Sequence, residues 1–162
     1  MGTPLTTVAT SADTGDCPNP DSEARVVVID DRQERRQLMT YVLEQAGNVV
    51  VVGYADGPVS ALEAVGRLRA NTVVLEVLLP VALGLDTISA LRDDFPALVI
   101  IVCSFHASPA TKQAVLDRGA DGYLAKPLSL PDLRAVLRSG PHRSTSLDAA
   151  NVFEGSSDVF GG

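Results

Sequence analysis

The chain has 162 residues, 46% of them apolar, which is enough for one domain with a packed core and room for tails. Its formal net charge is −7, yet residues 25–140 hold 12 basic and 13 acidic residues, so no basic patch for nucleic acid is expected. Two cysteines are too few for a disulfide framework, and no apolar run approaches the length of a membrane span.

Both ends of the chain are polar. Residues 1–24 are rich in Thr, Ser, Asp, Gly and Pro and hold four acids with no base, so we expect a disordered tail. They lack the pattern of a signal peptide, which favours a cytoplasmic protein. Residues 140–162 are expected to form a second flexible tail that is too short for a helix-turn-helix output domain. Two Val-Phe pairs, at 152–153 and 159–160, leave a docking peptide open as an alternative there.

Between the tails, over residues 25–139, strand and helix patterns alternate five times. Continuous β-branched and apolar runs predict strands at 25–29, 48–52, 72–77, 97–103 and 122–125. Apolar residues at helical spacing predict a helix after each strand. The first of these helices is expected over 33–46, with Asp31 as its N-cap and Gly47 as its stop.

This strict alternation predicts an α/β fold of one class. Five β-α units imply a parallel sheet with right-handed crossovers and with helices on both faces. The most economical arrangement is a flavodoxin-like, doubly wound, five-stranded sheet with the strand order 2-1-3-4-5.

Polar side chains stand where four of the predicted strands end. Asp30 and Asp31 follow the first strand, Glu76 lies at the end of the third, Ser104 follows the fourth and Lys126 the fifth. Because parallel strands on one edge gather their ends, we expect these side chains to meet in a single crevice. Three carboxylates with a hydroxyl and a lysine form an acidic pocket that suits a divalent cation and a phosphoryl group.

The same residues carry a family resemblance. Four parts of the chain resemble a bacterial two-component response-regulator receiver domain. They are the run Val-Ile-Asp-Asp at 28–31, the run Val-Val-Leu-Glu-Val-Leu-Leu-Pro at 73–80, Ser104, and the run Gly-Ala-Asp-Gly-Tyr-Leu-Ala-Lys-Pro at 119–127. The resemblance covers about residues 25–139. It implies a Mg²⁺ site, a phosphoacceptor position, and switch and phosphate-binding residues. The resemblance assigns the Mg²⁺ site to Asp30, Asp31, Glu76 and the carbonyl of Leu78. It assigns the phosphoacceptor position to Glu76. The switch and phosphate-binding residues are Ser104, Tyr123 and Lys126.

Glu76 departs from the family pattern, in which an aspartate accepts the phosphoryl group from a histidine kinase. Glutamate is one methylene longer, so its carboxylate would stand where the in-line donor belongs, and positioning dominates phosphoryl transfer. We therefore expect ordinary phosphorylation to be lost, or to be mimicked by a carboxylate that approaches Ser104 and Lys126. We expect Mg²⁺ to bind only weakly, since this ion enforces a near-octahedral geometry.

Simpler interpretations of single residues stay open at this point. Asp30 and Asp31 could merely cap the following helix. Glu76 could form a static ion pair with Lys126 without any metal. Ser104 could be an ordinary loop hydroxyl, and Tyr123 could be a packing aromatic.

The prediction for the whole chain is a stand-alone, atypical receiver (a pseudo-receiver) that is not an enzyme and signals through protein–protein contacts. Expected partners are a histidine kinase or a regulated protein, or a second copy bound through the fourth helix, fifth strand and fifth helix. Neither direct nucleic-acid binding nor membrane insertion is expected. The alternative from another class is a small cofactor-binding or phosphoryl-transfer enzyme on the same fold, although 4% aromatic content with no Trp disfavours a flavin carrier.

Overall fold

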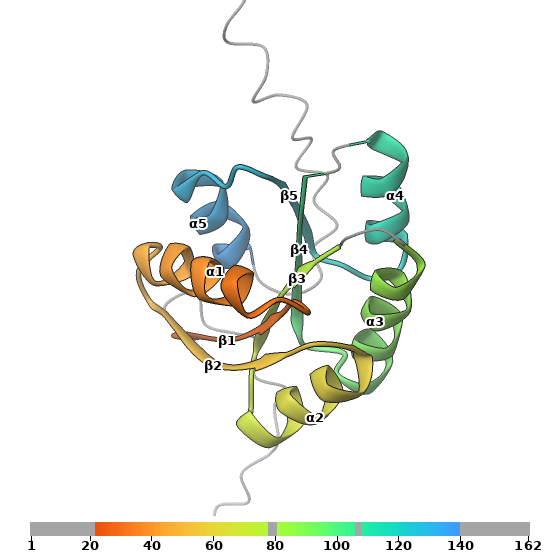
Figure 1. The fold of residues 1–162 in the computed structure, drawn as a ribbon, viewed down its shortest axis with the longest axis horizontal. Helices are drawn as coiled ribbons and strands as arrows, with labels where there is room; N and C mark the ends of the chain where they lie inside the picture. The colour runs from red at the N-terminus through yellow and green to blue at the C-terminus, as the bar shows by residue number, and fades with distance from the viewer. Residues whose placement is uncertain (1–21, 78–80, 106–107, 140–162) are drawn as a thin grey trace, which may run out of the picture.

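The computed structural model describes residues 22–77, 81–105 and 108–139, in which strands and helices alternate (Figure 1). The strands are β1 (Ala24–Ile29), β2 (Val49–Ala55), β3 (Thr72–Glu76), β4 (Val99–Ser104) and β5 (Gly122–Ala125). The helices are α1 (Gln33–Gln45), α2 (Pro58–Leu68), α3 (Val81–Asp94), α4 (Pro109–Asp117) and α5 (Leu130–Arg138). Residues 1–21 and 140–162 of the expected tails, and Leu78, lie outside the described residues. Strand β1 starts at Ala24, one residue earlier than predicted. Within the described ranges, no helix is long and apolar enough to cross a membrane.

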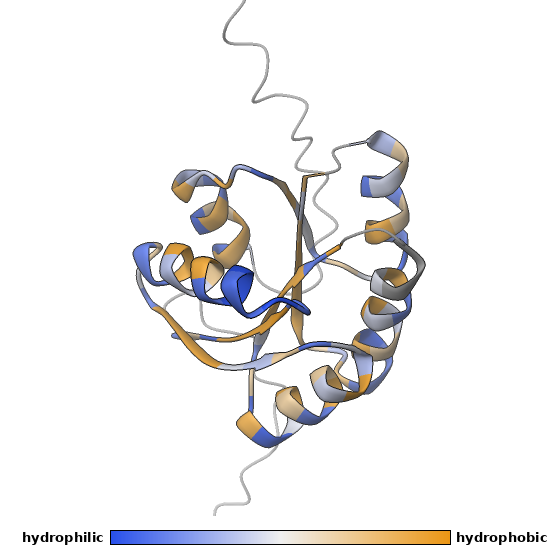
Figure 2. Ribbon diagram, viewed as in Figure 1, coloured by the Kyte–Doolittle hydropathy of each residue, from blue (hydrophilic) through white to orange (hydrophobic). Residues whose placement is uncertain are grey.

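The five strands form one parallel sheet in the order β2-β1-β3-β4-β5, which confirms the predicted flavodoxin-like arrangement. Figure 2 shows apolar residues running along the strands at the centre of the molecule, as expected for a sheet that is covered on both faces. The strand order reverses between β1 and β3, which pair directly, with Ile29 opposite Leu75. A crevice at the carboxyl ends of these two strands is where such folds place their sites.

Two apolar cores lie on the two faces of the sheet. One core packs α2, α3 and α4 against the sheet, with Leu91 and Val115 fully buried. The other core packs α1 and α5, with Leu43 and Leu133 fully buried. Burial of each such side chain contributes about 1.5–3 kcal/mol, so the two cores together hold the strand ends in register.

The start of α1 differs from the prediction. The N-cap is Arg32 and not Asp31, and its side chain makes no capping hydrogen bond. Instead, the backbone N–H of Arg32 donates to Asp30 Oδ1 at 2.8 Å, so the side chain of Asp30 binds the backbone just before the helix. On α1, Met39 faces the core and is buried, whereas Leu38 is 65% exposed.

Strand β4 starts at Val99, two residues later than predicted. The carbonyls of Pro96 and Leu98 each accept a hydrogen bond of 2.8 Å from Arg92 Nη1, so they are turned toward a side chain and away from the sheet. Strand β3 ends at Glu76, one residue early.

Strand β2 starts one residue later and ends three residues later than predicted. Asn48 has φ +55, outside the strand region, so the strand begins after it. A register shift in β1 between Val26 and Val27 brings Gly53 opposite Val27 and carries the pairing on to Ala55. A Cβ at position 53 would collide with Leu68, which is why glycine fits this close approach.

Candidate functional site

The fold brings all five of the predicted side chains to one edge of the sheet, with Asp31 directly after Asp30. Asp30 follows β1, Glu76 closes β3, Ser104 closes β4 and Lys126 follows β5. The register fixes their depth, since Glu76 lies opposite Cys103 and Ser104 lies opposite Ala125. The side chains of Asp30 and Glu76 are each only 3% exposed, so both acids are buried; the cluster that they form with Asp31, Ser104 and Lys126 is called the acidic pocket below.

Glu76 and Lys126 form an ion pair at the floor of this pocket. Lys126 Nζ lies 2.7 Å from Glu76 Oε2, and the lysine side chain is 12% exposed. The same ammonium stands over the ring of Phe105, 5.1 Å from its centroid. The other carboxylate oxygen, Glu76 Oε1, is buried and accepts no hydrogen bond from the described residues. The geometry is therefore that of the direct ion pair that the sequence alone left open.

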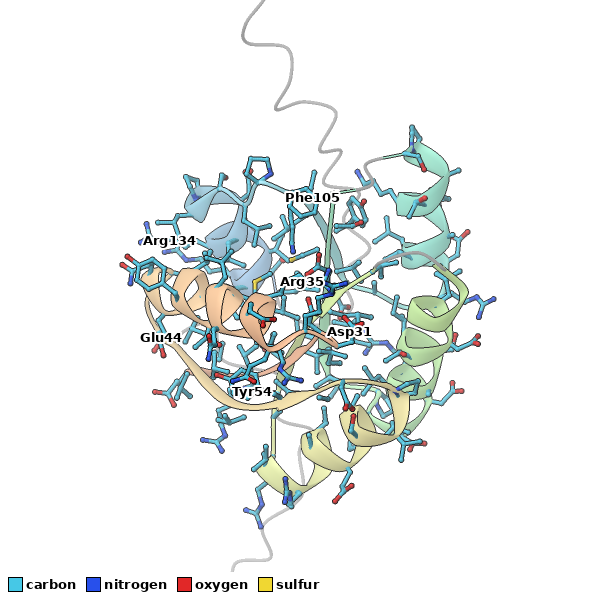
Figure 3. The ribbon with its side chains drawn as sticks, in the orientation of Figure 1. Asp31, Arg35, Glu44, Tyr54, Phe105 and Arg134 are labelled. Carbon is cyan, nitrogen blue, oxygen red and sulfur yellow. The ribbon has the colours of Figure 1, made fainter. Side chains whose placement is uncertain are left out.

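Arg35, which the sequence analysis did not single out, joins the acids of the pocket. Its Nε donates to Asp30 Oδ1 at 3.0 Å and its Nη2 donates to Asp31 Oδ1 at 2.6 Å. The same Nε lies 3.9 Å from Glu76 Oε2. Figure 3 shows Arg35 and Asp31 side by side at the start of α1. The one available signal was the spacing of four residues between Asp31 and Arg35, which places them on one side of a helix start.

Charge in the pocket is nearly balanced by the chain itself. Three carboxylates face two cations, Arg35 and Lys126, which leaves a formal charge of −1. Burial, together with a hydrogen bond that its protonated form can donate to Glu76, raises the pKa of Asp30. Burial also acts to raise the pKa of Glu76, but the same hydrogen bond with Asp30 and the Lys126 ammonium outweigh it and leave that pKa lowered. Glu76 is thus the firmly anionic member of the acid pair.

Ser104 and Tyr123 have well-defined surroundings. Ser104 is fully buried, and its hydroxyl donates to the carbonyl of Val77 at 3.0 Å. The Ser104 carbonyl in turn accepts from the backbone N–H of Lys126 at 2.9 Å, which ties the lysine to the end of β4. Tyr123 is half-buried and packs against the core that α2, α3 and α4 cover. Their roles as switch residues stay predictions.

The response regulator receiver domain family matches residues 26–138 of this chain. The doubly wound sheet, with acids at the carboxyl ends of its strands, is typical of receiver domains. The family match shows that this chain belongs to the receiver domain family. Among curated relatives, response regulator MprA of Mycobacterium leprae is 36% identical over 126 residues, which cover 78% of this chain and 54% of that protein. The probable transcriptional regulatory protein TcrX of Mycobacterium tuberculosis is 35% identical, with 70% and 49% covered.

The chain therefore spans about half the length of these curated relatives. Solved structures agree on the fold. The receiver domain of the response regulator NarL from M. tuberculosis matches with a TM-score of 0.64 and 28% identity, covering 73% of this chain and 95% of that one. The isolated receiver domain of RcsB from Salmonella enterica serovar Typhimurium, with the phosphomimetic BeF3⁻, matches with a TM-score of 0.64 and 26% identity, covering 75% and 93%.

Receiver domains typically bind Mg²⁺ at the phosphorylation site, which is the edge of the sheet where the acids of this chain lie. Across residues 22–77, 81–105 and 108–139, no group of three Asp, Glu, His or Cys side chains is arranged to hold a metal. Asp30 and Asp31 each give an oxygen to Arg35, and Glu76 gives one to Lys126. Arranged in this way, the three carboxylates do not fit Mg²⁺, which requires oxygen ligands in near-octahedral geometry.

Proposed function

We propose that this chain is an atypical receiver that signals through protein–protein contacts and whose phosphorylation switch is lost or held in one state. One observation carries the proposal. The family resemblance places the phosphoacceptor aspartate at the end of β3, which is the position of Glu76. The Glu76 side chain is 3% exposed, and its Oε2 lies 2.7 Å from Lys126 Nζ.

Reach and burial both act against phosphoryl acceptance by Glu76. The acceptor oxygen must approach the phosphorus in line, and most of the catalysis in this reaction is positioning. Glu76 Oε2 is already paired with the lysine, and Oε1 is buried. Both oxygens would have to leave their present surroundings before either could attack a phosphodonor.

The same geometry supports a mimic of the phosphorylated state. Lys126, which the resemblance assigns to the phosphoryl group, is neutralised by a carboxylate of the chain itself. Ser104 is fully buried, and Tyr123 is half-buried against the core. A difference of a few kcal/mol between two conformations is enough to hold such a domain in one of them.

The remaining parts of the proposal concern organisation and partners. We assign the receiver to residues 25–139 together with Ala24, where β1 begins, and expect the rest of the two tails, 1–23 and 140–162, to be flexible and the location to be cytoplasmic. A histidine kinase, a regulated protein or a second copy would bind, the last through α4, β5 and α5. One similar structure is named a DNA-binding response regulator from Staphylococcus aureus. The near-neutral charge of residues 25–140 nevertheless argues against direct nucleic-acid binding by this chain.

An NMR experiment with BeF3⁻ and Mg²⁺ tests the proposal, with the Glu76→Asp variant in parallel. We expect the amide signals of Ser104 and Tyr123 in the unmodified chain to stay in place, because no free carboxylate awaits the phosphomimetic. The Glu76→Asp variant should show a weak second set of signals at these residues, and a stronger set when Arg35→Gln is added, because Arg35 otherwise holds an oxygen of both Asp30 and Asp31. A second set in the unmodified chain would contradict a fixed or lost switch.

A further inference from the structure

Three arginines follow the acid pair at the start of α1, and only one of them enters the acidic pocket. Arg32 is exposed, and its guanidinium makes no hydrogen bond or ion pair with the described residues. Arg36 donates to the backbone carbonyl of Asp30 at 3.2 Å, and its guanidinium lies 5.8 Å from the ring centroid of Tyr54. Arg35 alone reaches the acid side chains, and its own side chain is 25% exposed.

The position of Arg35 in α1 is unfavourable for a cation in its own right. It is the third residue of the helix, within the first turn, where the helix dipole favours negative charge. Its placement there is explained by the partners it meets. The guanidinium spreads two hydrogen bonds over two carboxylates, Asp30 and Asp31, and lies 3.9 Å from a third, Glu76.

A planar fork between acid groups is the geometry for which arginine, and not lysine, is suited. We propose that Arg35 is a resident counter-ion that takes the place of the divalent cation and closes the acidic pocket to metal. This inference goes beyond the proposed function, because it concerns the cation of the site and not the phosphoacceptor.

Competition for the same oxygens is the physical basis of the closure. A divalent cation at this site would bind the carboxylates of Asp30 and Asp31, and Arg35 already holds one oxygen of each, Oδ1 in both, at 3.0 and 2.6 Å. An ion that entered beside Arg35 would raise the formal charge of the pocket from −1 to +1. Arginine remains protonated in proteins, so it cannot relieve the repulsion by losing a proton. Metal entry therefore requires the whole side chain to leave.

Titration of the full chain with MgCl2, by calorimetry and by NMR of the Asp30, Asp31 and Glu76 region, tests this inference. The Arg35→Gln variant removes the fork. Arg32→Gln is the matched control, because it removes one positive charge three residues away and breaks no hydrogen bond or ion pair among the described residues. We expect Arg35→Gln to bind Mg²⁺ at least about tenfold more tightly than the unmodified chain. Arg32→Gln should stay within about twofold, as expected for a screened surface charge.

Several outcomes would overturn the inference. Equal affinity of Arg35→Gln and the unmodified chain would mean that Arg35 does not close the pocket. An equal gain in both variants would mean that net charge, and not the fork, sets the affinity. If Arg35→Gln does not fold, Arg35→Met, which keeps an unbranched stem and helix propensity, carries the same test. In the unmodified chain, the Nε–H signal of Arg35 should also stay unchanged at Mg²⁺ concentrations that saturate the variant, and its displacement there would overturn the inference.

These readouts are independent of phosphorylation. A chain that accepts a phosphoryl group could still show the Arg35 effect on Mg²⁺ affinity, and a chain that does not could lack it. Failure of the proposed function and failure of this inference are therefore distinguishable.

Discussion

Lys126 Nζ and Glu76 Oε2 lie 2.7 Å apart at the carboxyl edge of the sheet, with the glutamate side chain 3% exposed and the lysine side chain 12% exposed. Each charge loses most of its hydration on folding, so each depends on the other to offset the cost of burial. Because the pair joins the end of β3 to the residue after β5, it spans the strand ends on both sides of β4.

A double-mutant cycle should detect this dependence. Glu76→Gln and Lys126→Met, made singly, each leave one buried charge without its partner and should lower the free energy of unfolding by about 3–5 kcal/mol. The double variant should lose clearly less than the sum of the two. Urea unfolding measures all four proteins, and strictly additive losses would show that the pair is not coupled.

Loss of the Ser104 hydroxyl should be costly out of proportion to its size. It donates to the carbonyl of Val77 at 3.0 Å in a fully buried setting, so Ser104→Ala leaves a buried acceptor with one donor fewer. We expect about 1–3 kcal/mol of destabilisation in a thermal or urea denaturation series. A loss below about 0.5 kcal/mol would place this hydrogen bond among the dispensable ones.

Shortening the glutamate should restore part of the family chemistry. In Glu76→Asp the carboxylate withdraws by one methylene and leaves room for an in-line phosphodonor, while Asp30, Ser104 and Lys126 remain in place. We expect slow, measurable phosphorylation by acetyl phosphate with Mg²⁺. Intact-mass spectrometry measures the phosphorylated fraction over time. Adding Arg35→Gln to Glu76→Asp should increase the rate, since the pocket would then admit the metal. Complete inertness of both variants would contradict this prediction.

The thiol of Cys103 should be unreactive in the folded protein. It is fully buried in β4, and burial raises its pKa to about 12. At pH 8 only about one molecule in ten thousand would carry the reactive thiolate. In a Cys17→Ser background, iodoacetamide should label Cys103 only as fast as the chain unfolds. Labelling at the rate of a free thiol would contradict this burial.

The sequence alone predicts the strand order and five of the pocket residues, because both follow from hydrophobic periodicity and from where strands end. What it could not show are contacts made by long side chains. Arg92 donates hydrogen bonds to the carbonyls of Pro96 and Leu98, so β4 begins later than predicted. Arg35 bridges acids that the sequence analysis had assigned to a metal or to helix capping. Both arginines lie on helices, where charged residues ordinarily face solvent, so their pattern does not distinguish a structural fork from a surface charge.

The reaction of the unmodified chain with a small phosphodonor tests the central claim most directly. The chain of residues 1–162 is incubated with acetyl phosphate and Mg²⁺, and its intact mass is measured before and after hydroxylamine treatment. We expect a single species of unchanged mass, because both oxygens of Glu76 are buried and one is held by Lys126. A species heavier by one phosphoryl group that disappears with hydroxylamine would show an acyl phosphate and contradict the account.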